Sequence, residues 1–265
     1  MDLAYIDAHC HADLLLQSDD RFPEAYRIRQ CGGISWSFPE GIASCQEYPE
    51  YWDRLRSMCG RLSDEGVPFY YLVGIHPRCI PADLEMEPKL PQVLSEALGK
   101  HLDDPLCLGL GELGLDTASD PEKRILGWQL DLAVSHLPEN KRIGVHTPRA
   151  NKDPVTREVL DLLRGYDSLR NRLLIDHVSP QTFELVRKEG YSPVGMTLQK
   201  GKTSVEDLAR FIREDPSRAQ HVVLNSDSVR QISDRFLHLL DNPDTLLREE
   251  VCRLLLENAR DFYCL

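Results

Sequence analysis

Apolar runs that end in a histidine or an acidic residue recur along the whole chain. The clearest covers residues 67–75 and has the nearly continuous apolar character of a buried parallel strand. His76 and Pro77 follow it, and proline cannot continue the hydrogen bonding of a strand, so this strand should end at the histidine. Helical patterns separate most of these runs. Such alternation predicts parallel strands joined by crossover helices.

Eight strands are predicted in all, with boundaries at 5–11, 31–37, 67–75, 107–111, 142–145, 172–176, 192–197 and 221–226. Eight such units in 265 residues predict an α/β fold, the (β/α)8 TIM barrel, with active-site residues at the carboxyl ends of its strands. No linker or change in composition divides the chain, so residues 1–265 are expected to form one domain.

The connecting segments are expected to be mostly helical. Residues 12–30 are the exception, because they look polar and irregular. Residues 40–65 predict a helix broken near Pro49. Thr203-Ser-Val-Glu206 has the pattern of a capping box that opens a helix, and residues 246–262 predict a final amphipathic helix.

Charge and composition exclude several classes of protein. The net charge of −12 disfavours charge-driven binding to long nucleic acids or anionic membranes. The chain lacks a run of 18 apolar residues that could span a membrane, and no basic region precedes an apolar N-terminal part as in a secretory signal. The eight cysteines form no Cys-x-x-Cys pair, which indicates reduced thiols. A cytoplasmic location is therefore expected.

The first strand ends in two histidines that could share a metal ion. His9 and His11 are two residues apart, so their side chains should lie on one face of the strand while Cys10 faces the other way. A pair of surface or hydrogen-bonded histidines is the alternative interpretation.

Four further strands end in a possible ligand, which makes coincidence a poor explanation, since core histidines scatter without regard to strand ends. Imidazole and carboxylate together suit zinc, manganese or similar ions, and the lack of thiolate argues against a closed structural zinc site. Six ligands are too many for one tetrahedral ion and favour a two-metal site with a bridging carboxylate. The candidate ligands are His9, His11, Glu112, His146, His177 and Asp227.

The candidate ligands lie in short motifs that follow one another in a fixed order along the chain. These motifs are Asp7-Ala-His-Cys-His11, Gly74-Ile-His-Pro77, Gly111-Glu-Leu-Gly-Leu-Asp116, Val145-His-Thr-Pro-Arg149, Asp176-His177, Asn225-Ser-Asp227 and Glu257-Asn-Ala-Arg-Asp-Phe262. Their order resembles that of the TatD-like metal-dependent hydrolases of the amidohydrolase superfamily. The resemblance runs from end to end of the chain, and the ordered set of motifs is specific although each motif alone is weak.

The resemblance implies two divalent metal ions, with zinc, manganese and magnesium as the candidates. It implies that His9, His11, Glu112 and Asp227 hold one ion, that Glu112, His146 and His177 hold the other, and that Glu112 bridges the two. It further implies that Asp227 orients the attacking water and shuttles its proton, although an acidic residue after a strand can also be a simple helix cap. His76 would contact the phosphate or polarised oxygen of the substrate, or else merely hydrogen-bond a neighbouring loop.

Three basic residues are candidates for substrate binding. Arg149, three residues after His146, could reach a phosphate by a bidentate contact. Lys200 and Lys202 follow the seventh strand and should lie at the same rim. A solvated arginine and a basic turn before a helix are the alternatives. The loops that carry these residues differ from those of the better-known nuclease members.

These features predict a divalent-metal-dependent hydrolase. The resemblance favours a phosphodiesterase or deoxyribonuclease that attacks with a metal-bound hydroxide and takes a nucleic acid end or a nucleotide. A hydrolase of a small amide, ester or lactone is the first alternative, because the same metals can polarise a carbonyl. A barrel retained as a binding or assembly component is the second. The sequence identifies no protein partner.

Overall fold

One parallel sheet of eight strands forms the centre of the protein. In the computed structural model, which describes residues 3–265, the strands lie in chain order and each pairs in parallel with the next. Two backbone hydrogen bonds join the first strand to the segment after the last: Asp227 N donates to His9 O at 2.8 Å, and His11 N donates to Ser228 O at 2.9 Å. The protein is thus a (β/α)8 TIM barrel, as predicted. The first two residues of the domain predicted over 1–265 lie outside the described residues.

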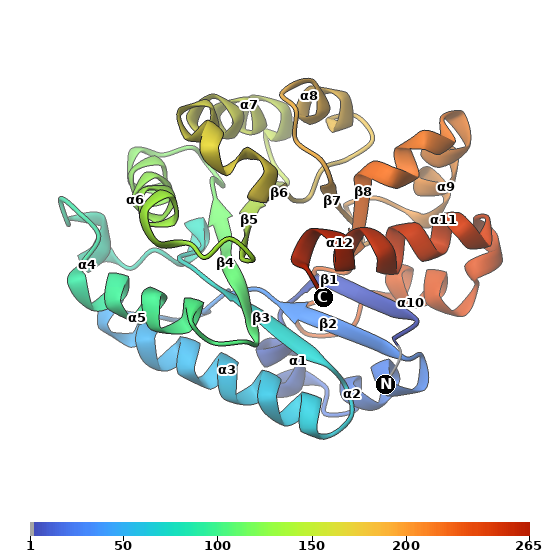
Figure 1. Ribbon diagram of the computed structural model, residues 1–265, viewed down its shortest axis with the longest axis horizontal. Helices are drawn as coiled ribbons and strands as arrows, with labels where there is room; N and C mark the ends of the chain where they lie inside the picture. The colour runs from blue at the N-terminus through green and yellow to red at the C-terminus, as the bar shows by residue number, and fades with distance from the viewer. Residues whose placement is uncertain (1–2) are drawn as a thin grey trace.

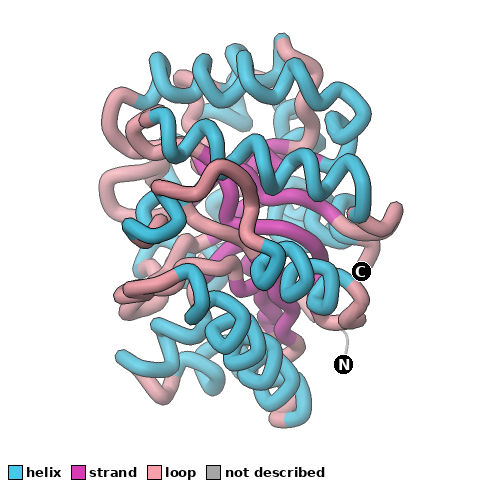
Figure 2. The backbone as a smooth tube through the Cα atoms, turned by 90° about the vertical axis from the view of Figure 1, so that its left-hand side faces the viewer, coloured by secondary structure: helices cyan, strands magenta, loops and turns pink. Residues whose placement is uncertain are grey.

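The strands are short and lie inside a layer of helices, as Figure 2 shows. They are β1 (Tyr5–Cys10), β2 (Cys31–Ser35), β3 (Phe69–Val73), β4 (Cys107–Gly114), β5 (Arg142–His146), β6 (Leu173–Ile175), β7 (Val194–Thr197) and β8 (Val222–Asn225).

The α-helices surround the strands in Figure 1. They are α1 (Ala12–Ser18), α2 (Phe22–Ile28), α3 (Tyr48–Asp64), α4 (Ala82–Glu85), α5 (Gln92–Leu102), α6 (Asp120–His136), α7 (Lys152–Leu163), α8 (Phe183–Lys188), α9 (Val205–Glu214), α10 (Asp234–Asp241), α11 (Arg248–Cys252) and α12 (Asn258–Tyr263). Short 3₁₀ or π segments are η1 (Cys45–Glu47), η2 (Pro77–Cys79), η3 (Arg164–Arg172), η4 (Pro216–His221), η5 (Pro243–Thr245) and η6 (Arg253–Glu257). Within residues 3–265, no helix is both long enough and apolar enough to cross a bilayer.

Two apolar clusters hold the barrel together. The smaller joins side chains from β1, β2, β3, β4, β6 and β8, which can meet only inside the ring of strands, and Phe262 and Tyr263 of α12 complete it. The larger fills the layer between strands and helices. Trp36 belongs to the inner cluster and needs Gly144 opposite, because a Cβ there would come within 2.3 Å of the indole ring. The inner cluster supports the end of the barrel where the polar residues gather.

Residues 12–30 are helical, contrary to the expectation of an irregular stretch. They form α1 and α2, which bury Leu14 and Leu15 from the first helix and Phe22 and Tyr26 from the second. Each helix has only seven residues, so its apolar face is too short to produce a clear period in the sequence.

Three boundaries also differ from expectation. Pro49 lies in the first turn of α3, where its missing N–H costs nothing, so it starts the helix and does not break it. Glu112 lies inside β4, which continues to Gly114. Ser204, one residue after the expected cap, caps α9 by accepting a hydrogen bond from Asp207 N at 3.0 Å.

Candidate metal centre

Seven of the predicted site residues lie near the carboxyl ends of the strands. His9 is in β1, Glu112 in β4 and His146 ends β5, while His11, His76, His177 and Asp227 come directly or shortly after β1, β3, β6 and β8. All but Asp227 are buried, and the Asp227 side chain is 13% exposed. Burial of so many ionisable groups at one place requires that they satisfy one another or a ligand.

Glu112 is at the centre of the group, and its two carboxylate oxygens face different histidines. Oε2 lies 3.3 Å from His9 Nε2 and 3.8 Å from His11 Nε2. Oε1 lies 2.6 Å from His146 Nδ1 and 3.1 Å from His177 Nε2. The sequence predicted a carboxylate between two sets of histidines, and this is the arrangement that a bridging ligand requires.

Asp227 joins the side of the centre that holds His9 and His11. Its Oδ1 lies 3.3 Å from His11 Nε2 and 3.8 Å from His9 Nε2. Its Oδ2 accepts a hydrogen bond from Lys202 Nζ at 2.5 Å. One oxygen therefore faces the centre, while the lysine fixes the other.

The far nitrogen of each of the first two histidines has a fixed acceptor. His9 Nδ1 donates to Asp176 Oδ2 at 2.5 Å, and His11 Nδ1 donates to the carbonyl oxygen of Trp36 at 3.0 Å. A donating Nδ1 leaves Nε2 with its lone pair free, which is the form of histidine that binds a metal. The buried Nε2 of His9 has no hydrogen-bond partner within residues 3–265. Trp36 also stacks on the His9 ring, with centroids 4.0 Å apart and planes 12° apart.

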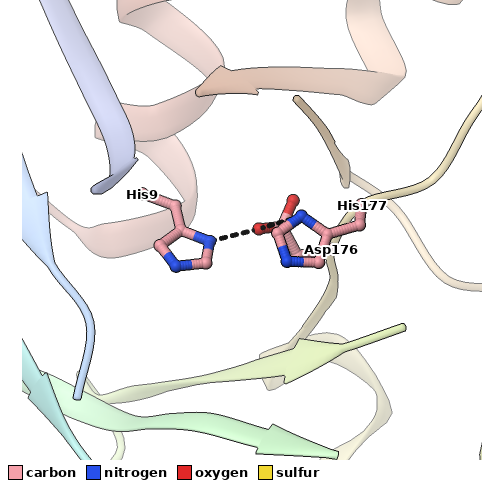
Figure 3. Close-up of side chains that lie close together, drawn as sticks. All are labelled: His9, Asp176 and His177. Carbon is pink, nitrogen blue, oxygen red and sulfur yellow. Dashed lines mark hydrogen bonds and ion pairs between the residues drawn. The ribbon is translucent and has the colours of Figure 1, made fainter. Parts of the chain in front are cut away.

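A chain of hydrogen bonds connects His9 to His177. Figure 3 shows the Asp176 carboxylate between these two imidazoles. Asp176 Oδ1 accepts from Asn225 Nδ2 at 2.8 Å, and Asn225 Oδ1 accepts from the Thr197 hydroxyl at 2.8 Å. Since that hydroxyl donates its proton to Asn225, its oxygen can accept from His177 Nδ1, 2.8 Å away, although Lys202 Nζ also lies 3.0 Å from this nitrogen. In the tautomer with a proton on Nδ1, His177 Nε2 faces Glu112 with a free lone pair, as His9 Nε2 does.

The packing around Asp176 explains a glycine on the neighbouring strand. A Cβ at Gly195 in β7 would come within 2.0 Å of Asp176 Oδ1. Only glycine lets the carboxylate lie against this strand and reach both His9 and Asn225.

His146 lies between two carboxylates. Its Nδ1 faces Glu112, and its Nε2 lies 3.3 Å from Asp116 Oδ1. Asp116 in turn lies 3.7 Å from Arg78 Nε. Asp116 thus orients His146 much as Asp176 orients His9.

His76 carries its proton on the ring nitrogen that faces the centre, whereas a metal ligand would present a lone pair there. Its Nδ1 accepts a hydrogen bond from the backbone N–H of Arg78 at 3.0 Å, so the neutral ring carries its proton on Nε2. That Nε2 lies 3.4 Å from Glu112 Oε2 and makes no hydrogen bond within the described residues. His76 therefore offers a donor to the centre, where His9 and His11 offer lone pairs.

The electrostatics place both central carboxylates in their charged forms. Burial alone would raise the pKa of Glu112, but His76, His9 and His146 hold it well below its usual value. Burial would likewise raise the pKa of Asp227, but Lys202 and His177 hold it well below its usual value. Ionised carboxylates are the form that binds a cation.

Two histidines are neutral near pH 7 for a different reason. Burial lowers the pKa of His76 to about 3 despite the nearby charge of Glu112. Burial and the charge of Lys202 lower the pKa of His177 to about 4. For His9 the balance reverses, because Glu112 and Asp176 outweigh burial and raise its pKa to about 10. A metal ion at His9 Nε2 would take the place of a proton.

Two candidate ligands have a backbone conformation that favours glycine. His177 has φ of 59° and Asp227 has φ of 47°, both in the left-handed region. Such residues cost on the order of 1 kcal/mol or more and persist where the surrounding structure holds them. Here the backbone at His177 directs its side chain toward Glu112, and the backbone at Asp227 directs its side chain toward His11.

The donor set fits metal ions. It offers imidazole nitrogens, ionised carboxylates and a buried His9 nitrogen that has no hydrogen-bond partner among the described residues. His9, His11, Glu112 and Asp227 could hold one ion, and Glu112, His146 and His177 could hold a second. Buried groups of three that could ligate an ion include His9 with His11 and Glu112, and His76 with Glu112 and His146. The tautomer of His76 argues against its use as a ligand in the second group.

The predicted basic residues are distributed unevenly. Lys202 is 12% exposed and contacts the centre directly through Asp227. Arg149 is exposed at the rim, and its guanidinium donates to Gln199 Oε1 at 3.0 Å. Lys200 lies on an exposed turn, and no hydrogen bond or ion pair links its ammonium to residues 3–265. The structure thus brings Lys202 to the centre, Arg149 near it and Lys200 away from it.

Sequence reasoning missed the residues that orient the ligands. Asp116, Asp176 and Asn225 are in the matching motifs, but the sequence alone does not indicate their role, and Trp36 and Thr197 gave no signal of their own. An acidic residue directly before a ligand histidine or shortly after a ligand glutamate was the available sign for Asp176 and Asp116. Lys152 was also missed, because a lysine at the first position of a helix gives no sequence signal of burial beside other cations.

The fold and the site together define a barrel protein with a candidate metal centre at the carboxyl ends of its strands, the usual place of an active site in this fold. Residues 6–214 match the family described as TatD related DNase. The chain belongs to this family, which confirms the resemblance found in the sequence.

Two relatives support this assignment over nearly the whole chain. An uncharacterized metal-dependent hydrolase of Methanocaldococcus jannaschii is 28% identical over 271 residues, which cover 97% of this chain and 99% of the relative. The crystal structure of a TatD-like protein from Archaeoglobus fulgidus is 28% identical, covers 98% of this chain and 100% of that one, and has a TM-score of 0.75. The protein is therefore a homologue of metal-dependent hydrolases.

A more distant structure shares the fold alone. A protein from Agrobacterium tumefaciens is 12% identical and has a TM-score of 0.58, with 100% of this chain and 97% of that chain covered.

Proposed function

We propose that this protein is a phosphodiesterase that depends on two divalent metal ions. The observation that carries the proposal is the position of Glu112, whose two oxygens face separate histidines at 2.6–3.8 Å. One carboxylate between two ligand sets is what a two-ion site needs, and paired ions are common in enzymes that cleave phosphate esters.

The two sides of the centre would hold one ion each. His9, His11 and Asp227 would supply the first side and His146 and His177 the second, with Glu112 shared. Zinc, manganese and magnesium are the candidates for these ions. When bound, such ions activate water and offset the negative charge that develops on a phosphate.

Asp227 is proposed to orient the attacking water and accept its proton. Its Oδ1 faces the centre, while Lys202 occupies Oδ2. Because Lys202 and His177 hold the pKa of this carboxyl well below its usual value, it is ionised near pH 7 and is a weak base. We therefore expect orientation of the water to contribute more than proton removal.

His76 is proposed to donate a hydrogen bond to a phosphate oxygen of the substrate. Its Nε2–H points into the centre and lacks a partner within 3–265. Its lowered pKa keeps the ring neutral over the range in which the enzyme would work, so it acts as a donor without adding charge.

The basic side chains beside the centre favour a phosphodiester over an amide, ester or lactone. Lys202 contacts Asp227, and Arg149 lies at the same rim. Such groups match the charge of a phosphate, whereas a neutral carbonyl substrate would leave them without a role. The net charge of −12 disfavours binding along a long DNA, so a nucleic acid end or a nucleotide is the favoured substrate.

A substrate panel on metal-loaded protein tests the proposal. Bis(p-nitrophenyl) phosphate, a short single-stranded oligonucleotide, an N-acyl amide and a lactone would each be assayed with Mn²⁺, Zn²⁺ or Mg²⁺. Hydrolysis of the phosphodiesters well above that of the carbonyl compounds is the expected result. Preference for the amide or lactone would reject it. Bound metal without turnover of any member would favour a binding or assembly role.

Metal content gives a second test. Protein purified without chelator is expected to carry about two divalent ions per chain by elemental analysis. Stoichiometric uptake of one ion, with no second uptake at higher concentration, would reject the shared role of Glu112.

A further inference from the structure

A cavity beside the metal centre has a strongly basic wall. Its volume is about 460 Å³, within the range of small-ligand sites. His177, Thr197 and Lys202 line it, so it is continuous with the side of the centre formed by His177. The basic side chains on its wall are Arg149, Lys152, Lys202, Arg210 and Arg218.

Ion pairs within the protein account for only some of this positive charge. The two acidic residues on the wall pair with arginines: Asp207 lies 3.3 Å from Arg210, and Glu214 lies 3.3 Å from Arg218. Lys202 pairs with Asp227. Within residues 3–265, no carboxylate lies within 4.0 Å of the charged groups of Arg149 or Lys152. Among the described residues, these two cations therefore have no direct ion-pair partner.

Lys152 is held at this wall by neutral groups. Its Nζ donates to the carbonyl oxygen of Pro148 at 3.0 Å and lies 3.4 Å from Thr147 Oγ1. It is the first residue of α7, where the positive end of the helix dipole is unfavourable for a cation. Burial, followed by the nearby charge of Lys202, lowers the pKa of Lys152 to about 8, and the opposing effect of the Asp176 charge does not offset this. An anion in the cavity would relieve this repulsion.

Arg149 is directed over the same space by the loop after β7. Its Nη2 donates to Gln199 Oε1, and Gln199 Nε2 in turn donates to the carbonyl oxygen of Asp227 at 2.6 Å. Gln199 thus connects the guanidinium to the segment that carries a candidate ligand. The hydrogen bond to Gln199 therefore holds the exposed Arg149 side chain close to the metal centre.

We infer that this cavity binds a second anionic group of the substrate, a terminal phosphate, through Arg149 and Lys152 while the scissile ester lies on the metal centre. Lys202 lies between the two sites and lines both. The inference rests on the proposed function and narrows it to short phosphodiesters that carry a terminal phosphate. Two cations without a direct ion-pair partner among the described residues, with Lys202 beside them, suit a dianion better than the single charge of an internal nucleotide.

Two substrates with the same scissile bond test this inference. They are p-nitrophenyl thymidine 5′-phosphate with a free 3′-hydroxyl and its 3′-phosphorylated form. The parent protein is expected to show kcat/KM ~10-fold or more higher for the phosphorylated substrate, about the effect of one charge-assisted hydrogen bond. Equal kcat/KM values for the two would overturn the inference.

Substitutions test whether Arg149 and Lys152 cause the preference for the phosphorylated substrate. Lys152→Met and Arg149→Met should each reduce the ratio of the two kcat/KM values by ~5–10-fold, and Lys152→Arg should retain most of it. Lys188→Met is the matched control, since Lys188 is exposed on α8 and does not line the cavity. A ratio that survives in both methionine variants would place the terminal phosphate elsewhere.

Direct binding separates this inference from the proposed function. Inorganic phosphate would be titrated calorimetrically into the full-length protein after chelator treatment, with succinate as the comparison anion. Phosphate binding that weakens ~10-fold in Lys152→Met supports the cavity even if neither ester is hydrolysed. Unchanged phosphate affinity in the variant, or equal affinity for succinate and phosphate, would reject the phosphate assignment even if both esters are cleaved.

Discussion

The metal centre and the basic cavity lie side by side but are built differently. In the centre, the histidines are buried and each has one nitrogen fixed by a second residue. In the cavity, Arg149 is exposed, Lys152 is half-buried, and both come from loops or the start of a helix. This difference fits the proposed roles, in which the centre would carry out the reaction and the cavity would select the substrate. Changes in the centre should therefore affect all substrates, and changes in the cavity only some.

The largest expected effect comes from Glu112→Ala. Because Glu112 faces both sets of histidines, this change should deplete both ions and lower kcat/KM by ~10³-fold or more for every substrate, which is a loss of about 4 kcal/mol. Elemental analysis and the phosphodiesterase assay on one preparation measure both effects. Asp104→Ala, at a buried carboxylate that precedes the start of β4, controls for loss of fold.

His146→Ala refines this prediction, because His146 contacts only one oxygen of Glu112. It should remove mainly one ion, while Glu112→Ala removes both. Small and equal losses of metal in the two variants would contradict the shared role.

Asp227→Asn is expected to lower kcat by ~10²-fold, the low end of the range for a general base, with little change in KM. The low end is expected because Lys202 keeps this carboxyl a weak base. Metal content must be measured alongside, since an amide is the weaker ligand. If the metal-replete variant turns over within a few-fold of the parent, Asp227 serves only as a ligand or cap.

The orienting residue Asp176 should have a smaller effect. Asp176→Asn presents an amide to both His9 Nδ1–H and Asn225 Nδ2, and its single oxygen cannot accept from both. Metal affinity should fall ~10–100-fold, as for other residues that orient a ligand. Equilibrium dialysis against a metal buffer measures this, with Asp104→Asn as the control. Unaltered affinity would show that His9 is oriented by its stacking on Trp36.

The smallest predicted effect concerns pH and the cavity. The pKa of Lys152 is lowered to about 8, so its side chain is mostly charged below pH 8 and loses its positive charge as the pH rises above that value. The terminal phosphate is already dianionic above pH ~6–7. The preference for the phosphorylated substrate should therefore decline between about pH 7 and 9 by a few-fold. In Lys152→Arg, which stays charged, the preference should remain level across this range.

The sequence predicted the metal centre better than the cavity for a physical reason. Parallel strands place their carboxyl ends at one rim, so residues such as His146 and His177 could be brought together from strand order alone. The residues that orient these histidines could not be predicted in this way. Thr197 and Asn225 are joined to Asp176 by contacts across three strands, and no local pattern shows such contacts.

The fold shows the same distinction. The recurring apolar runs and the helical patterns between them identified the barrel, whereas the seven-residue helices α1 and α2 were too short for a recognisable period. Lys152 illustrates the limit most clearly. A lysine at the start of α7 looks like an ordinary surface residue until the structure shows Lys202 beside it and no counterion within the described residues.

The left-handed backbone at His177 and Asp227 has a consequence for the durability of the protein. Each conformation disfavours an L side chain, so a chain selected only to resist heat would have glycine or asparagine at these positions. The candidate ligands His177 and Asp227 would therefore lower thermal stability in exchange for activity. Engineering that raises the melting temperature of this protein should therefore leave residues 177 and 227 alone and draw its gains from the far end of the barrel.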